Sequence, residues 1–246
     1  MESILDRPPP EADERLSYGG EPSQFGDLRL PRVAGPHPLV IALHGGFWRD
    51  RYDLSHLGHL CVALTEAGFA TFNLEYRRLG EPGGGYPGTC DDALAGARFA
   101  LRLPGIDASR AVLIGHSAGG HLALWAAKAL PVRGVVALAA VSDLKRAAEL
   151  RLSDGVAAEF VGEAPIGAAN SPIERLPLRL PQTLIHGTMD DVVPLAMSEA
   201  YVARATAAGD AAKLVALPGV DHYALIDPFS DVFTAVRDAV RALTNA

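Results

Sequence analysis

Short apolar runs alternate with stretches of helical periodicity over most of this chain. Runs such as 39–43, 110–114 and 134–140 are almost entirely apolar, which is typical of strands buried on both faces of a parallel sheet. Two earlier runs, 15–18 and 24–31, are separated by a Gly-Gly turn and predict an antiparallel pair. The pattern therefore predicts an α/β fold with a mostly parallel central sheet of about eight strands and helices on both faces.

The other expected strands and the helices follow from the same periodicity. Further strands are expected at residues 69–74, 183–186 and 213–217, and helices at 53–67, 89–103, 120–128, 195–208 and 228–243. Residues 142–181 break the alternation with short helical pieces punctuated by Ala, Gly and Pro, so we expect them to form a small lid or cap inserted over the strand ends. No linker or internal repeat divides the chain, and residues 1–246 are expected to form a single domain that contains this insertion.

The composition narrows the choice of partners. Hydrophobic residues make up 49% of the chain and charged residues 21%, which is ordinary for a soluble globular protein. The formal net charge of −7 argues against a nucleic-acid-binding surface and against attraction to anionic membranes, so neither partner is expected. The first ten residues do not resemble a secretory signal, and no apolar run approaches the length of a transmembrane helix. We therefore expect a cytoplasmic protein that is a monomer or a homodimer.

The segment 115–119 reads Gly-His-Ser-Ala-Gly and lies between a predicted strand and a predicted helix. In that context G-x-S-x-G predicts a nucleophile elbow, a tight turn that holds a serine above the edge of the sheet. Ser117 is expected at an unusual backbone angle, and side chains at positions 115 and 119 would collide with the neighbouring strand and helix. The N-terminus of the following helix would direct its free N–H groups toward an oxyanion formed there.

Two further loops follow predicted strands and should meet the elbow at the carboxyl edge of the sheet. A serine needs a base to take its proton, and His222 in the loop 218–223 fits that role. The base needs a carboxylate that fixes its tautomer, and the loop 186–194 offers Asp190 and Asp191. The position of Asp190 relative to the end of the preceding strand favours it as the acid, while Asp143, after an earlier strand, is a third candidate.

Residues 44–48, His-Gly-Gly-Phe-Trp, follow a buried strand and are expected to supply the oxyanion hole. Glycine lets the backbone approach the charged oxygen of a tetrahedral acyl-transfer intermediate. The expected donors are the backbone N–H groups of Gly46, Phe47 and Ala118. His44 is interpreted as a hydrogen-bonding residue that holds this loop in place.

Candidate pocket residues are Trp48 in the oxyanion loop, His116 in the elbow and Tyr223 after the expected base. His56 and His59 have the i, i+3 spacing of a helical metal pair, but no third ligand or acidic cluster accompanies them, so no metal site is expected. No P-loop and no G-x-G-x-x-G follow the first strand, which gives no support to nucleotide binding.

Cys61 and Cys90 have neither the spacing of a metal site nor that of a disulfide framework. They are interpreted as small buried side chains rather than nucleophiles.

With these residues placed, the chain resembles α/β-hydrolases of the esterase and kynurenine formamidase-like (arylformamidase) group over nearly its whole length. The most specific pieces are His-Gly-Gly-Phe-Trp at 44–48 and Gly-His-Ser-Ala-Gly-Gly-His-Leu at 115–122. The resemblance implies an α/β-hydrolase fold, Ser117 as nucleophile, Asp190 as acid, His222 as base, and no cofactor. Hormone-sensitive-lipase-type esterases differ, because a third glycine stands where this chain has Phe47.

These observations predict a serine hydrolase that cleaves a small-molecule carboxylic ester or aryl formamide through an acyl-enzyme on Ser117, as a carboxylesterase or arylformamidase does. One alternative is a peptidase of the prolyl-oligopeptidase-like type acting on short peptides. Such a peptidase needs a site for the peptide terminus and usually a further domain, for which this chain leaves no room. The other alternative is a non-catalytic receptor with a hydrolase fold, which would be expected to have lost Ser, Asp or His.

Overall fold

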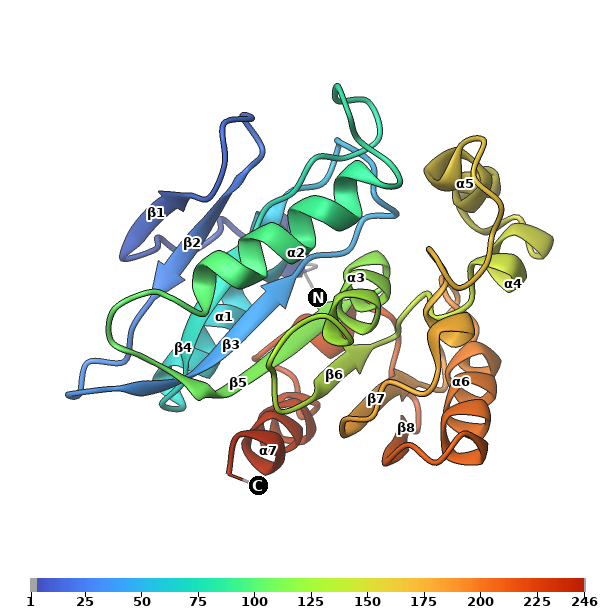
Figure 1. Ribbon diagram of the computed structural model, residues 1–246. Helices are drawn as coiled ribbons and strands as arrows, with labels where there is room; N and C mark the ends of the chain where they lie inside the picture. Colours follow the sequence, from blue (N-terminus) through green and yellow to red (C-terminus); the bar gives the residue numbers. More distant parts are fainter. Residues whose placement is uncertain (1–3, 246) are drawn as a thin grey trace.

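An eight-stranded sheet forms the centre of the computed structural model, which describes residues 4–245 (Figure 1). The strands are β1 (Glu14–Ser17), β2 (Phe25–Arg29), β3 (His37–Leu43), β4 (Ala70–Leu74), β5 (Ile106–His116), β6 (Val135–Leu138), β7 (Gln182–Gly187) and β8 (Ala212–Leu217). They lie in the order β1-β2-β4-β3-β5-β6-β7-β8. The β1–β2 and β2–β4 pairs are antiparallel and all other pairs are parallel, which confirms the predicted mostly parallel sheet.

Helices cover both faces of this sheet, as predicted. They are α1 (Gly58–Glu66), α2 (Gly88–Ala100), α3 (Ala118–Ala127), α4 (Leu144–Glu149), α5 (Leu152–Val161), α6 (Leu195–Ala207) and α7 (Phe233–Thr244). Short 3-10 helices occupy Ile4–Asp6, Leu54–Leu57, Pro172–Arg175 and Tyr223–Ile226. Helices α1 and α7 pack on one face, and α2, α3 and α6 on the other (Figure 1).

The apolar runs that predicted strands are the centre of the core. Every residue of 39–43 is fully buried, and so are all four residues of 111–114. Side chains alternate between the two faces along a strand, so a strand without polar interruption must be covered on both sides. Leu39, Ile41 and Leu43 accordingly belong to the cluster with α2 and α3, whereas Val40 and Ala42 belong to the cluster with α1 and α7.

Two predicted helices differ in detail from those observed. The helix expected over 53–67 is divided into the 3-10 helix Leu54–Leu57, capped by Asp53, and α1. The helix expected over 228–243 begins only at Phe233, because the Asp227 carboxylate accepts the N–H of Phe229 and Ser230 bonds the Asp227 carbonyl, which forms a turn after Ile226. Neither difference includes Ser117, Asp190 or His222.

Residues 142–181 connect β6 to β7 and contain α4, α5 and the 3-10 helix Pro172–Arg175. Helices α4 and α5 lie beyond the carboxyl ends of the central strands, away from β1 and β2 (Figure 1). The short helical pieces expected in this segment are therefore present, at the edge of the sheet where the three candidate loops meet.

Glycines allow the turn after β5 to sit tightly between its neighbours. A Cβ atom at position 119 would lie 2.0 Å from the carbonyl oxygen of Leu43 and 2.3 Å from that of His44. A Cβ atom at position 115 would lie 2.2 Å from the carbonyl oxygen of Gly119. The predicted collisions with the neighbouring strand and helix are therefore confirmed.

Replacement of Gly119 by alanine tests how strongly this close approach constrains the fold. Alanine is the better helix former by about 1 kcal/mol. Backbone atoms would nevertheless have to move to admit its methyl group, and we expect Gly119→Ala to lower the free energy of unfolding by about 1–3 kcal/mol. Urea denaturation measures the difference, with Gly20→Ala as the control because no atom lies within 4 Å of a Cβ there. Equal stability of the two variants would contradict the argument.

Candidate active site

The backbone of Ser117 adopts the conformation expected of a strained turn. Its φ of 55° and ψ of −117° lie outside the ordinary regions for a residue with a side chain. Two hydrogen bonds to the β6 side of the sheet hold it there: the Ser117 N–H donates to the Leu138 carbonyl at 2.8 Å, and the Val141 N–H donates to the Ser117 carbonyl at 3.2 Å. The serine side chain therefore stands at the carboxyl edge between β5 and α3.

Asp190 and His222, which follow the neighbouring strands β7 and β8, meet directly. The Nδ1 atom of His222 lies 2.7 Å from Oδ2 of Asp190. An ionised carboxylate only accepts hydrogen bonds, so the proton of the neutral imidazole is on Nδ1 and the lone pair on Nε2. His222 is 2% exposed, and it lines the same cavity as Ser117, which is also 2% exposed.

Asp190 is held ionised by its neighbours. Its Oδ1 accepts the N–H groups of Val192 and Val193 at 2.9 and 2.8 Å, and its Oδ2 also lies 3.2 Å from Nε2 of His186. Burial alone would raise the pKa of Asp190, but the hydrogen bonds from His186 and His222 outweigh it and hold that pKa well below its usual range. The contribution of His186 is not visible in the sequence, although the histidine lies only four residues before Asp190.

The other two acids considered from the sequence lie elsewhere. Asp191 is exposed and lines the cavity, and no hydrogen bond joins it to His222 among the described residues. Asp143 caps α4, since its side chain accepts the Arg146 N–H at 3.0 Å. Of the three candidate acids, Asp190 is therefore the one that bonds His222 in the described residues.

A pair of buried histidines supports the loop that carries His222. The Nε2–H of His116 donates to the carbonyl oxygen of His222 at 3.0 Å, so Nδ1 of His116 is the acceptor for the Nε2–H of His56 at 2.8 Å. Burial lowers the pKa of His56 to about 3 and that of His116 well below its usual range. Both rings are consequently neutral hydrogen-bonding groups. The sequence suggested that His116 lines the substrate pocket, but it is not among the residues that line the cavity.

The oxyanion loop turns sharply after β3. Gly46, Phe47 and Trp48 have φ angles of 104°, 52° and 58°, three successive residues in the left-handed region. None of the hydrogen bonds described for residues 4–245 uses the N–H of Gly46, Phe47 or Ala118. Gly46, Phe47 and Ser117 line one cavity, and Ala118 begins helix α3, whose first N–H groups have no partner within the helix.

Glu75 holds the oxyanion loop in place through a hydrogen bond with His44. The sequence did not identify this residue. It is 1% exposed at the end of β4, and its Oε1 accepts Nε2–H of His44 at 2.9 Å. Its Oε2 accepts the Leu54 N–H at 2.9 Å and lies 3.5 Å from Arg78. The bonding role assigned to His44 thus agrees with the structure. The one feature of the sequence that could have indicated Glu75 is its place directly after the buried strand β4, at the same edge of the sheet as the candidate site.

A cavity of about 420 Å³ opens beside Ser117. Phe47, Tyr52, His222 and Tyr223 line it from the sheet side, and residues 150–153 line it from the segment between β6 and β7. A larger hollow of about 710 Å³ lies between Pro10 and α1, but no residue of the Ser, Asp and His constellation reaches it. Of these two cavities, the one at Ser117 is therefore lined by residues of that constellation.

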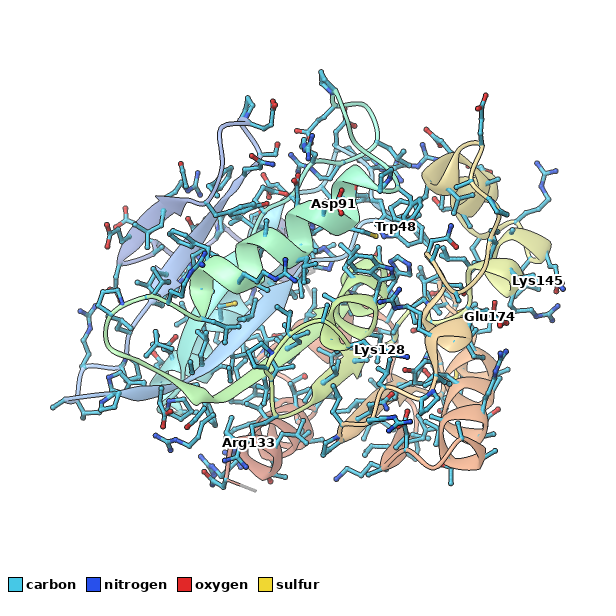
Figure 2. All side chains as sticks on the ribbon, viewed as in Figure 1. Trp48, Asp91, Lys128, Arg133, Lys145 and Glu174 are labelled. Atoms are coloured by element: carbon cyan, nitrogen blue, oxygen red, sulfur yellow. The ribbon has the colours of Figure 1, made fainter. Side chains whose placement is uncertain are left out.

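Trp48 does not line this cavity, contrary to the expectation from its place in the loop. It is 1% exposed, stacked on Phe160 with ring centroids 4.3 Å apart and packed edge-on against His121. In Figure 2 the Trp48 label lies between helix α2 and the segment that carries α5. The rotation of the loop through left-handed angles turns Trp48 into the core and leaves Phe47 at the cavity. Tyr223 lies at the cavity, as expected.

Residues 4–245 show neither a metal-ligand cluster nor a helix that could span a membrane. His56 bonds His116 rather than pairing with His59. Burial raises the pKa of Cys61 to about 12 and raises that of Cys90 further, so both thiols stay protonated, as expected of buried cysteines.

The sheet order, the serine at the tight turn after β5 and the loops after β7 and β8 together define an α/β-hydrolase fold. A truncated carbohydrate esterase from gut microbiota is similar in structure, with a TM-score of 0.80 and 21% identity over 96% of this chain and 98% of that one. At that identity the likeness establishes the fold alone. The profile of the BD-FAE family matches residues 27–204, and the chain belongs to that family.

The relatives that are similar in sequence include a rice protein and a mycobacterial protein. The probable isoprenylcysteine alpha-carbonyl methylesterase ICME of Oryza sativa subsp. japonica is 28% identical over 240 residues, which cover 83% of this chain. This chain spans only 56% of the length of that rice protein. Esterase LipU of Mycobacterium tuberculosis (strain H37Rv) is 29% identical over 235 residues, covering 85% of this chain and 76% of that protein.

The buried residue His121 predicts that the free energy of unfolding decreases in mild acid. Burial lowers the pKa of His121 to about 4, so below pH 6.5 the unfolded chain binds a proton there that the folded protein does not. Unfolding is then favoured by about 1.4 kcal/mol per pH unit for this group, or about 2 kcal/mol between pH 7 and pH 5.

We expect His121→Gln to reduce the loss of stability between pH 7 and pH 5 by about 2 kcal/mol, because glutamine does not titrate. Urea denaturation of both proteins at the two pH values gives the comparison. The change between pH values within each protein is the quantity of interest, so a uniform destabilisation by the substitution does not obscure it. An identical pH dependence in the two proteins would show that His121 is not held neutral by burial.

Proposed function

We propose that this protein is a serine hydrolase of the carboxylesterase type, with Ser117 as nucleophile, His222 as base and Asp190 as the acid that orients it. The observation that carries the proposal is the bond between Asp190 and Nδ1 of His222, which leaves the lone pair of Nε2 at the cavity that Ser117 lines. A serine hydroxyl is a weak nucleophile at neutral pH, and a neutral imidazole with a free nitrogen is the group that activates it.

The reaction follows from these positions. His222 takes the hydroxyl proton as Ser117 Oγ attacks the ester carbonyl, and the carbonyl oxygen becomes an oxyanion. The N–H groups of Gly46, Phe47 and Ala118 are proposed to stabilise that charge. The imidazolium gives its proton to the departing alcohol, which leaves an acyl-enzyme. Water then attacks the acyl group with His222 as base, and the acid and Ser117 are released.

Esters are proposed as the principal substrates. Relatives in sequence carry the names methylesterase and esterase, and similar structures include a carbohydrate esterase and a bacterial heroin esterase. Aryl formamides are the second candidate, supported by the resemblance of segments 44–48 and 115–122 to arylformamidases. That support is weaker because Trp48, the most distinctive residue of the first segment, packs in the core and does not meet the cavity.

Residues 142–181 are proposed to act as a small lid within a single domain. Leu150 to Ser153 line the cavity opposite Ser117, so this segment bounds the space available to substrate. The segment is attached to the oxyanion loop by the ion pair of Arg49 with Glu159 at 3.1 Å.

The first prediction from this mechanism concerns Ser117. We expect Ser117→Ala to lower kcat/KM for p-nitrophenyl acetate by at least about 10³-fold, because no other group in the proposed mechanism forms the acyl-enzyme. A fluorophosphonate should label the native protein at Ser117, identified by mass spectrometry of the labelled peptide. Assay of N-formylkynurenine beside the ester separates formamide from ester preference. Equal activity of native protein and variant on both substrates would exclude Ser117 as the nucleophile.

The second prediction separates the two acids of the loop. Asp190→Asn removes the negative charge that stabilises the His222 imidazolium, and we expect kcat for p-nitrophenyl acetate to fall by about 10²–10⁴-fold. Asp191→Asn is expected to change kcat by less than tenfold, because no bond joins Asp191 to His222 in the described residues. Steady-state kinetics of both variants test the assignment, and a larger loss in Asp191→Asn would reverse it.

A further inference from the structure

The wall of the cavity beside Ser117 carries two arginines that the proposed mechanism does not use. Arg51 follows the oxyanion loop, and Arg151 precedes α5 in the segment between β6 and β7. Both are exposed, and neither forms an ion pair with a carboxylate of residues 4–245. A guanidinium stays charged at all physiological pH values, so each presents a permanent positive charge at this cavity.

The neighbouring Arg49 shows how differently a structural arginine is used. It lies two residues before Arg51, and its guanidinium bonds Glu159 at 3.1 Å and the Ser153 carbonyl at 3.4 Å. The charge and the N–H donors of Arg49 therefore connect the oxyanion loop to α5. The Arg51 guanidinium instead lies 4.9 Å from the centroid of the Tyr52 ring, and Tyr52 itself lines the cavity. Arg51 is thus held along the wall with its donors unused by any carboxylate.

The charge of this cavity contrasts with the charge of the whole chain. The formal net charge is −7, with 29 acidic and 22 basic side chains, so two cations that line one cavity without a carboxylate partner run against the general composition. Asp190 also lies at this edge, but it is buried and its charge is taken up by hydrogen bonds from His186 and His222. Asp191 is the opposing charge at the cavity, and it pairs with neither arginine in the described structure.

We propose that the substrate of this hydrolase carries an anionic group, such as a carboxylate, which Arg51 and Arg151 bind at this cavity while Ser117 attacks the ester. This inference rests on the proposed function and specifies its substrate class. Guanidinium groups suit this task because their planar donors match the two oxygens of a carboxylate. The anionic group is not part of the reacting ester, so the two arginines act by binding it and take no part in bond breaking.

Two pairs of esters of matched shape test the proposal. In the first pair the leaving group of 4-acetoxybenzoate carries a carboxylate, and 4-acetoxybenzamide has a neutral amide in its place. In the second pair the acyl chain of monophenyl succinate ends in a carboxylate, and phenyl 4-methylpentanoate has an uncharged isopropyl group in its place. For each pair the quantity is the ratio of kcat/KM for the anionic ester to that for the neutral one, after subtraction of hydrolysis without protein.

We expect at least one ratio to favour the anion in native protein. In Arg51→Gln and Arg151→Gln that ratio should fall by about 2- to 5-fold each, the range for exposed charge pairs, mainly through KM. Asp191→Asn should raise the same ratio, because it removes the opposing charge. Addition of 0.5 M NaCl should lower it in native protein and have little effect in the double arginine variant. Arg102→Gln is the matched control, since Arg102 is exposed near the start of β5, at the opposite edge of the sheet.

The proposal is overturned if both ratios are the same in native protein and in the two arginine variants. It is also overturned if each arginine variant loses the neutral and the anionic ester equally, since that result would indicate a structural role. Failure of the proposed function itself is recognised separately, because Ser117→Ala would then hydrolyse the neutral esters as fast as native protein does.

Discussion

The strained turn at Ser117 is the constraint on which the rest of this site depends. A serine at a φ of 55° and a ψ of −117° costs roughly 1–3 kcal/mol and persists only where the surroundings fix it. Hydrogen bonds with Leu138 and Val141 fix it from the β6 side, and the contact of Gly119 with the end of β3 fixes it from the other. The same contact places the oxyanion loop beside the serine, so one tight packing arrangement brings the proposed nucleophile and its hydrogen-bond donors together.

The remaining polar groups act mainly by holding backbone in place. Glu75 fixes the oxyanion loop through His44, and His116 holds the carbonyl oxygen of His222. These side chains are nearly or fully buried, and a buried polar group left without partners costs about 1–3 kcal/mol. The networks are therefore expected to be rigid, which suits a site where donors must already be aimed at the charge that develops in the transition state.

Much of the site was predictable because it lies in loops that directly follow apolar strands. The runs at 39–43, 110–114 and 183–186 predicted parallel strands, and the carboxyl ends of parallel strands meet at one edge. Ser117, Asp190 and His222 could thus be placed together from spacing, and the structure brings Asp190 and His222 within 2.7 Å. Glu75 and His186 were missed, because whether a polar side chain after a strand faces a partner depends on the packing of other elements.

The strand and helix pattern, the mostly parallel sheet and the residues at its carboxyl edge follow from the sequence, because periodicity and glycine positions are local properties. The directions of the side chains at that edge depend instead on how distant elements pack. Trp48 turns into the core and Phe47 stays at the cavity, because the loop passes through three left-handed residues. The presence of Arg51 and Arg151 at one cavity likewise depends on how residues 142–181 pack over the sheet, since 100 positions of sequence separate the two arginines.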